Sequence, residues 1–147
     1  MTTILASGVF DLLHYGHIRF LEEAKRLGGP NARLVVIVAR DETVVKTKGR
    51  RPIIPEDQRR AVVEALKVVD EALLGYENMD FGAVIGRIRP DVIAVGHDQD
   101  DVERETVRII YEKGLNLKVV RIGRFGPEEL NSSSKIKRKI VEDWGRG

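Results

Sequence analysis

The sequence predicts an α/β protein in which one doubly wound, parallel sheet of five strands is covered by helices on both faces. Short apolar runs alternate with helical patterns along the whole chain, as in repeated strand–helix units, and five repeats are too few for an eightfold barrel. The run at 34–39 is continuous and rich in β-branched residues, which is typical of a buried parallel strand. No linker or low-complexity stretch interrupts the pattern, so we expect one domain over residues 1–147.

The first half of the chain carries three strand signals and two helix signals. Strands are expected at 3–6, 34–39 and 69–74, where apolar residues cluster. A pattern with apolar residues at spacings of three begins near His17 and predicts a helix. Pro55 suits the first turn of a second helix. We expect this helix to bury Ala61, Val62, Ala65 and Leu66.

The second half of the chain continues the alternation. Apolar residues at i, i+3, i+4 and i+7 predict a helix over 81–88, and a strand follows at 92–95. Another helical pattern ends at Gly114, before a fifth strand at 117–122. The last helix is expected from about Ser133, with one apolar face formed by Ile136, Ile140, Val141 and Trp144.

The composition excludes several classes of protein. With 42% hydrophobic and 33% charged residues, a chain of 147 residues suits a soluble globular fold. It has no cysteine, which excludes disulfides, thiolate catalysis and cysteine-based zinc sites. No apolar run approaches the roughly 18 residues that a membrane span needs, and no signal peptide is visible before the first strand. We therefore expect a cytoplasmic protein that does not bind membranes.

The charge of the chain is nearly balanced. It has 25 basic and 23 acidic residues, which gives a formal net charge of +2. Proteins that bind nucleic acid nonspecifically usually carry a one-sided basic excess, so we expect no nucleic-acid partner. Basic residues do gather at 46–51 and at 135–139, and the simplest interpretation of such runs is a solvated face.

The segment His-Tyr-Gly-His at 14–17 stands where the first strand gives way to the first helix. In an open α/β sheet, ligands bind past the carboxyl ends of the strands, and helix N-termini there favour phosphate oxygens. Histidines in this position can donate hydrogen bonds to a phosphate whose charge grows in a transition state. Two alternatives are a helix cap and a metal site formed by Asp11, His14 and His17, although the one remaining histidine, His97, is distant.

Further polar segments follow the other strands and should meet at the same edge of the sheet. Residues 40–51 follow the second strand, and residues 96–99 follow the fourth. Asp98 can accept hydrogen bonds from a ribose or from the amino group of adenine, or it can cap the next helix. We assign no role to His97.

The segment 131–135 opens the last helix with three serines in a row. Their hydroxyls and the free backbone amides can form a second anion site beside Lys135 and Lys137, or they can act as an ordinary serine cap. The glycine-rich phosphate loop of Walker-type NTPases is absent from the sequence, as is the G-x-G-x-x-G motif of dinucleotide-binding enzymes.

Three motifs resemble those of the cytidylyltransferase-like nucleotidyltransferases, which carry a G-x-F-D turn, an H-x-G-H signature and a late serine/threonine segment. They are the turn at 8–11, the segment 14–17 and the late run at 132–137, and the resemblance covers nearly the whole chain. Within that family, further stretches look like those of the archaeal FAD synthases; they lie at 38–43, 48–56, 89–93 and 96–99. The fold that this resemblance implies is a Rossmann-like nucleotidyltransferase fold.

The resemblance also implies a reaction, in which AMP passes from ATP to FMN and yields FAD and pyrophosphate. His14 and His17 would bind the phosphates and stabilise the transition state. Lys46, as a further catalytic residue, would neutralise charge together with Arg59. The remaining nucleotide-binding residues would be Val9, Phe10, Tyr15, Gly16, Asp98, Arg124, Phe125, Ser133 and Ser134.

The cofactor expected from the resemblance is a divalent metal ion, Mg²⁺, which would bind the phosphates with few protein ligands and no dedicated protein metal site. ATP and FMN are the expected partners. Because members of this family often dimerise, the resemblance also implies a homodimer.

One departure from the family pattern bears on the choice of nucleotide. Cytidylyltransferases place an arginine-led R-T-E-G stretch before the late serine/threonine segment, whereas here Pro127 takes the place of the arginine and Arg124 lies three residues earlier. This difference favours ATP over CTP. The alternatives are a cytidylyltransferase that acts on glycerol phosphate and a nucleotide-binding regulator without turnover.

Overall fold

The computed structural model describes residues 1–76, 80–123 and 132–145. They form a five-stranded sheet in the order β3-β2-β1-β4-β5, and every neighbouring pair of strands is parallel. The strands are β1 (Thr2–Gly8), β2 (Ala32–Val38), β3 (Glu71–Leu74), β4 (Val92–Val95) and β5 (Lys118–Arg121). The predicted fold class and all five predicted strands are confirmed.

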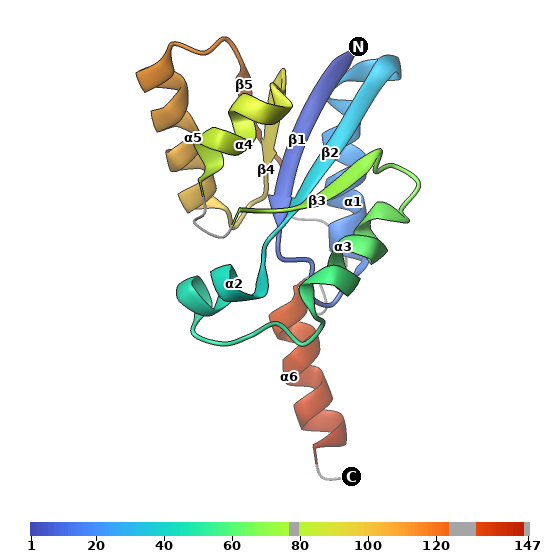
Figure 1. Cartoon of the computed structure of the whole chain (residues 1–147). Helices are drawn as coiled ribbons and strands as arrows, with labels where there is room; N and C mark the ends of the chain where they lie inside the picture. Colours follow the sequence, from blue (N-terminus) through green and yellow to red (C-terminus); the bar gives the residue numbers. More distant parts are fainter. Residues whose placement is uncertain (77–79, 124–131, 146–147) are drawn as a thin grey trace.

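Helices follow the strands in the doubly wound pattern that the sequence predicts (Figure 1). They are α1 (Tyr15–Arg26), α2 (Asp41–Lys48), α3 (Glu56–Glu64), α4 (Phe81–Ile88), α5 (Asp100–Lys113) and α6 (Ser133–Trp144), with a short 3-10 turn η1 (Gly29–Asn31) before β2. None of these helices combines the length and the apolar character that crossing a membrane requires.

The two faces of the sheet have separate cores because successive strand residues point to opposite sides. Ile4 and Val36 lie on the face that packs against α1 and α3, together with Leu21, Ala24 and Val63 of those helices. Leu5, Val35 and Ile93 lie on the other face, against residues of α4 and α5 that include Val84, Ile85 and Ile109. The strands are thereby held on both sides, and their carboxyl ends carry the loops of the candidate site.

Helix α3 shows a different buried face from the one that the sequence pattern predicts. Its buried residues are Arg59 and Val63, while Ala61, Val62 and Ala65 are exposed and Leu66 is half-buried. The prediction was wrong for Ala61, Val62 and Ala65, whereas Leu66 packs against the core beside α1 and α3. The buried side of the helix is formed by Arg59 and Val63, and Val62, with 48% of its surface accessible, faces outward.

Helix α2 was not predicted, because only Thr43 and Val44 of its residues are buried and no apolar stripe marks it. Its ends nevertheless carry ordinary helix signals. Asp41 and Glu42 stand in the first turn, and Gly49 ends the helix in the left-handed conformation with φ of 80°.

Helix α6 lies beyond the carboxyl end of β1 and extends away from the sheet (Figure 1). It starts at Ser133 as predicted, but none of its residues is buried. The predicted apolar face is therefore largely open in this chain, with Ile140, Val141 and Trp144 among the exposed side chains.

Candidate active site

The turn after β1 brings the first strand onto the start of α1. Phe10 adopts the left-handed conformation with φ of 53°, which is unusual for a residue other than glycine, and its side chain is only 5% exposed. Its ring lies 5.3 Å from the ring of His17, at an angle of 60°. The strained turn therefore places the ring of Phe10 next to the ring of His17.

His14 and His17 are in direct contact at the N-terminus of α1. Their rings are stacked, with centroids 3.8 Å apart and an interplanar angle of 26°. The backbone N–H of His14 donates a hydrogen bond to Nδ1 of His17 over 3.2 Å. A neutral imidazole that accepts at Nδ1 carries its proton on Nε2, so this bond fixes His17 as an Nε2–H donor.

The surroundings of the pair favour the neutral form of both rings. Burial, followed by the neighbouring His14, lowers the pKa of His17 to about 4, although the charge of Asp98 acts in the opposite direction. Burial also lowers the pKa of His14. Near neutral pH the pair can therefore donate hydrogen bonds without carrying a fixed positive charge.

The loop after β4 reaches the same place. Asp98 is exposed, and its negative charge acts to raise the pKa of His17. The alternative role of Asp98 as a helix cap is not seen, because α5 begins at Asp100 with Gln99 at the cap position.

Gln99 is a positioning residue that the sequence analysis missed. Its Oε1 accepts a hydrogen bond from the backbone N–H of Gly96 over 2.8 Å, and its Nε2 donates to the carbonyl of Ser7 over 2.9 Å. This side chain ties the end of β4 to the end of β1. Gly96, His97 and Asp98 stand between β4 and Gln99, and nothing in the local sequence distinguishes Gln99 from the other polar residues of this loop.

The start of α6 lies against the turn that follows β1. Ser132 caps the helix by accepting from the backbone N–H of Lys135 over 3.2 Å, and the hydroxyl of Ser133 donates to the carbonyl of Leu12 over 3.2 Å. The backbone N–H of Leu12 lies 3.4 Å from the same hydroxyl. Ser133 therefore docks α6, whereas Ser134 is exposed at the helix start.

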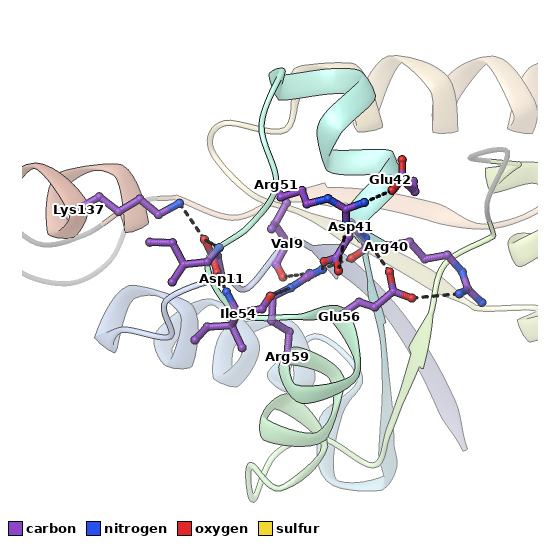
Figure 2. A network of polar contacts seen from close by, with 12 residues as sticks. Val9, Asp11, Arg40, Asp41, Glu42, Arg51, Ile54, Glu56, Arg59 and Lys137 are labelled. Atoms are coloured by element: carbon purple, nitrogen blue, oxygen red, sulfur yellow. Dashed lines mark hydrogen bonds and ion pairs between the residues drawn. The ribbon is translucent and has the colours of Figure 1, made fainter.

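Arg59 is a structural hub in place of the phosphate ligand that the resemblance implies. The side chain is 0% exposed, and its guanidinium donates to the backbone carbonyls of Val9, Ala39 and Ile54 over 2.7–2.8 Å. It also pairs with Asp41 over 2.6 Å. Because its three nitrogens are all engaged and the side chain is buried, Arg59 joins the loops after β1 and β2, and this structural role is the one that its contacts support (Figure 2).

The network around Arg59 extends to the loop after β3. Glu56 accepts from the backbone N–H of Asp41 over 2.8 Å and from the guanidinium of Arg40 over 3.1 Å. Arg40 in turn donates to the carbonyl of Gly75 over 2.6 Å. Arg51 is exposed to solvent. Its guanidinium lies 3.8 Å from the carboxylate of Asp41 and forms an ion pair with Glu42. The loops after three adjacent strands are thus joined by side chains (Figure 2).

Asp11 holds a second set of segments together. Its carboxylate accepts from the backbone N–H groups of Ile53 and Ile54 over 2.9 and 2.8 Å, and it pairs with Lys137 of α6 over 2.7 Å. Burial alone would raise the pKa of Asp11, but the hydrogen bonds from Lys137, Ile53 and Ile54 hold it below its usual value. Both oxygens are engaged, which argues against Asp11 as a metal ligand beside His14 and His17.

The other predicted site residues lie on the segments that follow the strands and at the helix starts. Val9 contributes the carbonyl that Arg59 binds, and Gly16 lies in the first turn of α1. Tyr15 is 58% exposed at the same helix start. Lys46 is an exposed residue near the end of α2. Arg124 and Phe125, together with Pro127, lie outside the described residues.

Comparisons with known proteins agree with the motifs. The chain matches the model of the family described as cytidylyltransferase-like over residues 5–139. A protein named FAD synthase from Methanopyrus kandleri is 47% identical over 144 residues, which is 98% of this chain and 95% of that protein. The FAD synthase of Ferroglobus placidus is 51% identical over 141 residues, covering 96% of this chain and 89% of that protein.

Solved structures give the same picture of the fold. A protein of Thermoplasma volcanium, described as a lipopolysaccharide core biosynthesis protein, superposes with a TM-score of 0.77 at 43% identity and covers 86% of this chain and 99% of its own. A structure from Streptococcus pneumoniae, described as a macrolide-efflux protein, reaches a TM-score of 0.66 at 18% identity over 96% of this chain and 52% of its own, and it supports the fold alone. From its motifs, its fold and its match over residues 5–139, the chain belongs to the cytidylyltransferase-like family.

Proposed function

We propose that this protein is an FAD synthase, a nucleotidyltransferase that transfers AMP from ATP to FMN and releases pyrophosphate. Relatives named FAD synthase are 44–51% identical to it over at least 94% of its length. The observation in this chain that carries the chemistry is the pair of stacked, neutral imidazoles at the N-terminus of α1.

In the proposed reaction a phosphate oxygen of FMN attacks the α-phosphorus of ATP. A new oxygen–phosphorus bond forms as the bond from the α-phosphorus to the bridging oxygen breaks, and pyrophosphate leaves with the electron pair. The phosphate of FMN is already an anion near neutral pH, so the protein needs no general base. Catalysis then consists of positioning and of stabilising charge on the transferred group.

The protein groups that meet these needs come from the described site. His17 offers its Nε2–H to the phosphates, and His14 stands beside it at the helix N-terminus, where backbone amides favour anions. Lys46 on α2 and the exposed Ser134 on α6 are the cation and hydroxyl that we assign to the outer phosphates. Asp98 is assigned to the ribose or adenine. Arg59 and Ser133 support the loops that carry these groups.

Mg²⁺ belongs to this proposal as part of the ATP complex. The described residues contain no cluster of three or more histidine, cysteine, aspartate or glutamate side chains suited to a metal ion. In this proposal the ion is held mainly by phosphate oxygens and water, as is usual for Mg²⁺ on nucleotides.

A single assay tests the choice of nucleotide and acceptor. Purified protein is supplied with ATP, CTP, GTP or UTP in turn, with FMN or glycerol phosphate as acceptor, and pyrophosphate release is measured. We expect ATP with FMN to be the best pair and FAD to be its product. Turnover at least tenfold better with CTP and glycerol phosphate would instead support the cytidylyltransferase alternative.

The expectations of a homodimer, of no nucleic-acid partner and of a cytoplasmic location stay part of this proposal. Size-exclusion chromatography with light scattering, run with and without ATP, measures the molar mass of the protein in solution and tests whether it is a dimer. Fluorescence anisotropy with a labelled duplex at low salt tests nucleic-acid binding, and we expect no saturable signal.

A further inference from the structure

A cavity of about 370 Å³ lies along the edge strand β3, away from the histidine pair. Its volume falls within the range of about 300–1,000 Å³ that is usual for small-molecule sites. The wall is formed by residues of β3, α3 and α4, by Ile37 of β2, and by Arg40 and Tyr76 of the loops that follow β2 and β3. None of the nucleotide-binding residues assigned above lines this cavity.

The lining combines apolar side chains with charged ones that are mostly paired. Ile37, Leu73 and Ile88 pack against the core between the sheet and helices α4 and α5. Among the charged residues, Arg60 pairs with Glu64, Glu71 with Arg33 and Arg40 with Glu56. Tyr76 and Arg87 both line the cavity, and the hydrogen bond between their side chains raises the pKa of Arg87. An aromatic ring and a guanidinium thus lie next to one another in its wall.

This combination suits a flat, uncharged, aromatic ring system with carbonyl oxygens at one end. The hydrocarbon end of such a ring can contact the apolar side chains of the lining, and its face can stack on Tyr76. The guanidinium of Arg87 can donate to carbonyl oxygens and can also stack on an aromatic face. The isoalloxazine ring of a flavin has this division between a dimethylbenzene end and a pyrimidine end.

The position of the cavity fits an acceptor that reaches the histidines from the β3 side. Neighbouring strands are spaced about 4.8 Å apart, so β3 lies about 10 Å from β1 across β2. In the pose that we infer, the ribityl chain and the phosphate of FMN span this separation between the strands. Asp98, which we assign to the nucleotide, follows β4 on the opposite side of β1 and leaves the β3 side to the acceptor.

Arg40 connects the cavity to the reaction centre. It lines the cavity and binds the carbonyl of Gly75 and the carboxylate of Glu56. Glu56 continues through Asp41 to Arg59, which holds the carbonyl of Val9 in the turn before His14 (Figure 2). The cavity wall and the histidine turn therefore belong to one hydrogen-bonded network.

We propose that the cavity beside β3 binds the isoalloxazine ring of FMN, with the ribityl chain crossing β2 to bring the phosphate to His14 and His17. This inference rests on the proposed FAD synthase function and adds the site of the flavin ring.

The test is direct binding of two flavins to the Tyr76→Ala and Arg87→Ala variants. Both side chains are exposed, so the variants are expected to fold. Flavin fluorescence quenching gives the Kd for FMN and for riboflavin, which lacks the phosphate. Matched controls are Tyr111→Ala and Arg108→Ala on α5, where the tyrosine is 88% exposed and the arginine pairs with Glu105 and Glu112.

We expect each cavity variant to weaken the binding of both flavins about tenfold, in line with the loss of one stacked or charged contact. The Kd for ATP should stay within twofold of wild type, Tyr76→Phe should retain flavin binding, and the two control variants should behave as wild type. If wild type forms FAD but both cavity variants bind FMN and riboflavin as wild type does, the flavin ring binds elsewhere and this inference is wrong. If wild type forms no FAD from ATP and FMN, the proposed function itself fails.

Discussion

The chemistry of the site depends at the residue scale on one backbone hydrogen bond. The N–H of His14 donates a hydrogen bond to Nδ1 of His17, which fixes the proton of that ring on Nε2. The H-x-G-H pattern predicts both histidines, but the sequence alone does not give their tautomer or their stacking. The tautomer follows from the hydrogen bond that the backbone of His14 donates, and the stacked pair lies next to the ring of Phe10.

Replacement of His17 by alanine tests its role in the transition state. Removing a donor that acts on developing charge typically lowers kcat on the order of 100- to 1000-fold, while ATP binding changes much less. The measurement is kcat and ATP Kd on folded His17→Ala protein with excess Mg²⁺. A kcat within threefold of wild type would exclude the catalytic role, and loss of wild-type activity to a chelator that only Zn²⁺ restores would indicate a zinc site.

The lowered pKa of His17 also predicts that the stability of the protein depends on pH. Its pKa is about 4 in the folded chain against an ordinary value of 6.5, so the unfolded chain binds more protons between these values. Stability therefore falls as the pH falls from about 6.5 towards 4, with a slope of at most about 1.4 kcal/mol per pH unit from this group. Thermal unfolding across this range should show a weaker dependence in His17→Asn than in wild type. Equal slopes in the two proteins would show that other groups cause the effect.

Helix α6 illustrates at the element scale what a sequence pattern reveals and what it does not. Three serines before a helical pattern predict its start correctly. The partner of Ser133 is the backbone of Leu12, which lies 121 residues earlier, and no local pattern carries such a long-range contact. For the same reason the buried hub formed by Arg59 was missed, since an arginine in a helical pattern is ordinarily assigned to the solvent face.

The serines of α6 should separate into two kinds under mutation. Ser134→Ala should raise the KM for ATP severalfold with an unchanged Tm, because the residue is exposed at the N-terminus of a helix, where anions are favoured. Ser133→Ala should also lower the Tm, because it removes the hydroxyl that binds Leu12. Ser132→Ala, which removes the cap, serves as the structural control and should cost about 1 kcal/mol. Unchanged ATP kinetics in Ser134→Ala would leave α6 without a role in nucleotide binding.

The whole molecule depends on joining loops that follow different strands. The strands themselves were predictable because each is a compact apolar run, and the parallel sheet follows from their alternation with helices. How the loops are joined was not predictable, because Arg59, Asp11 and Gln99 act through backbone groups that carry no sequence signature. The histidine motif marks the place of the site, and these polar contacts determine its shape.

Arg59→Met should therefore act mainly on stability. It leaves the largely buried Asp41 and three backbone carbonyls without their donor, and breaking such a buried pair typically costs about 3–5 kcal/mol. Arg108→Met is the matched control, since exposed ion pairs contribute about 0–1 kcal/mol. Urea unfolding of both variants measures the difference. An Arg59→Met protein as stable as wild type, but with a raised KM for ATP, would restore the phosphate-ligand role.

The central place of β1 has a consequence for the order of folding during synthesis. On one side β1 pairs with β2 in the register Thr2–Ala32 to Gly8–Val38, and β3 pairs with β2, so these three strands and the Arg59 network are complete once the first 76 residues are made. The other edge of β1 gains its partner only when Val92–Ala94 of β4 emerges. Until then the nascent chain exposes a row of unpaired backbone groups along its innermost strand, which is a template for pairing with another chain. We therefore expect β1, β2 and β3 to be able to pair early, whereas the free edge of β1 stays open to aggregation until β4 pairs with it.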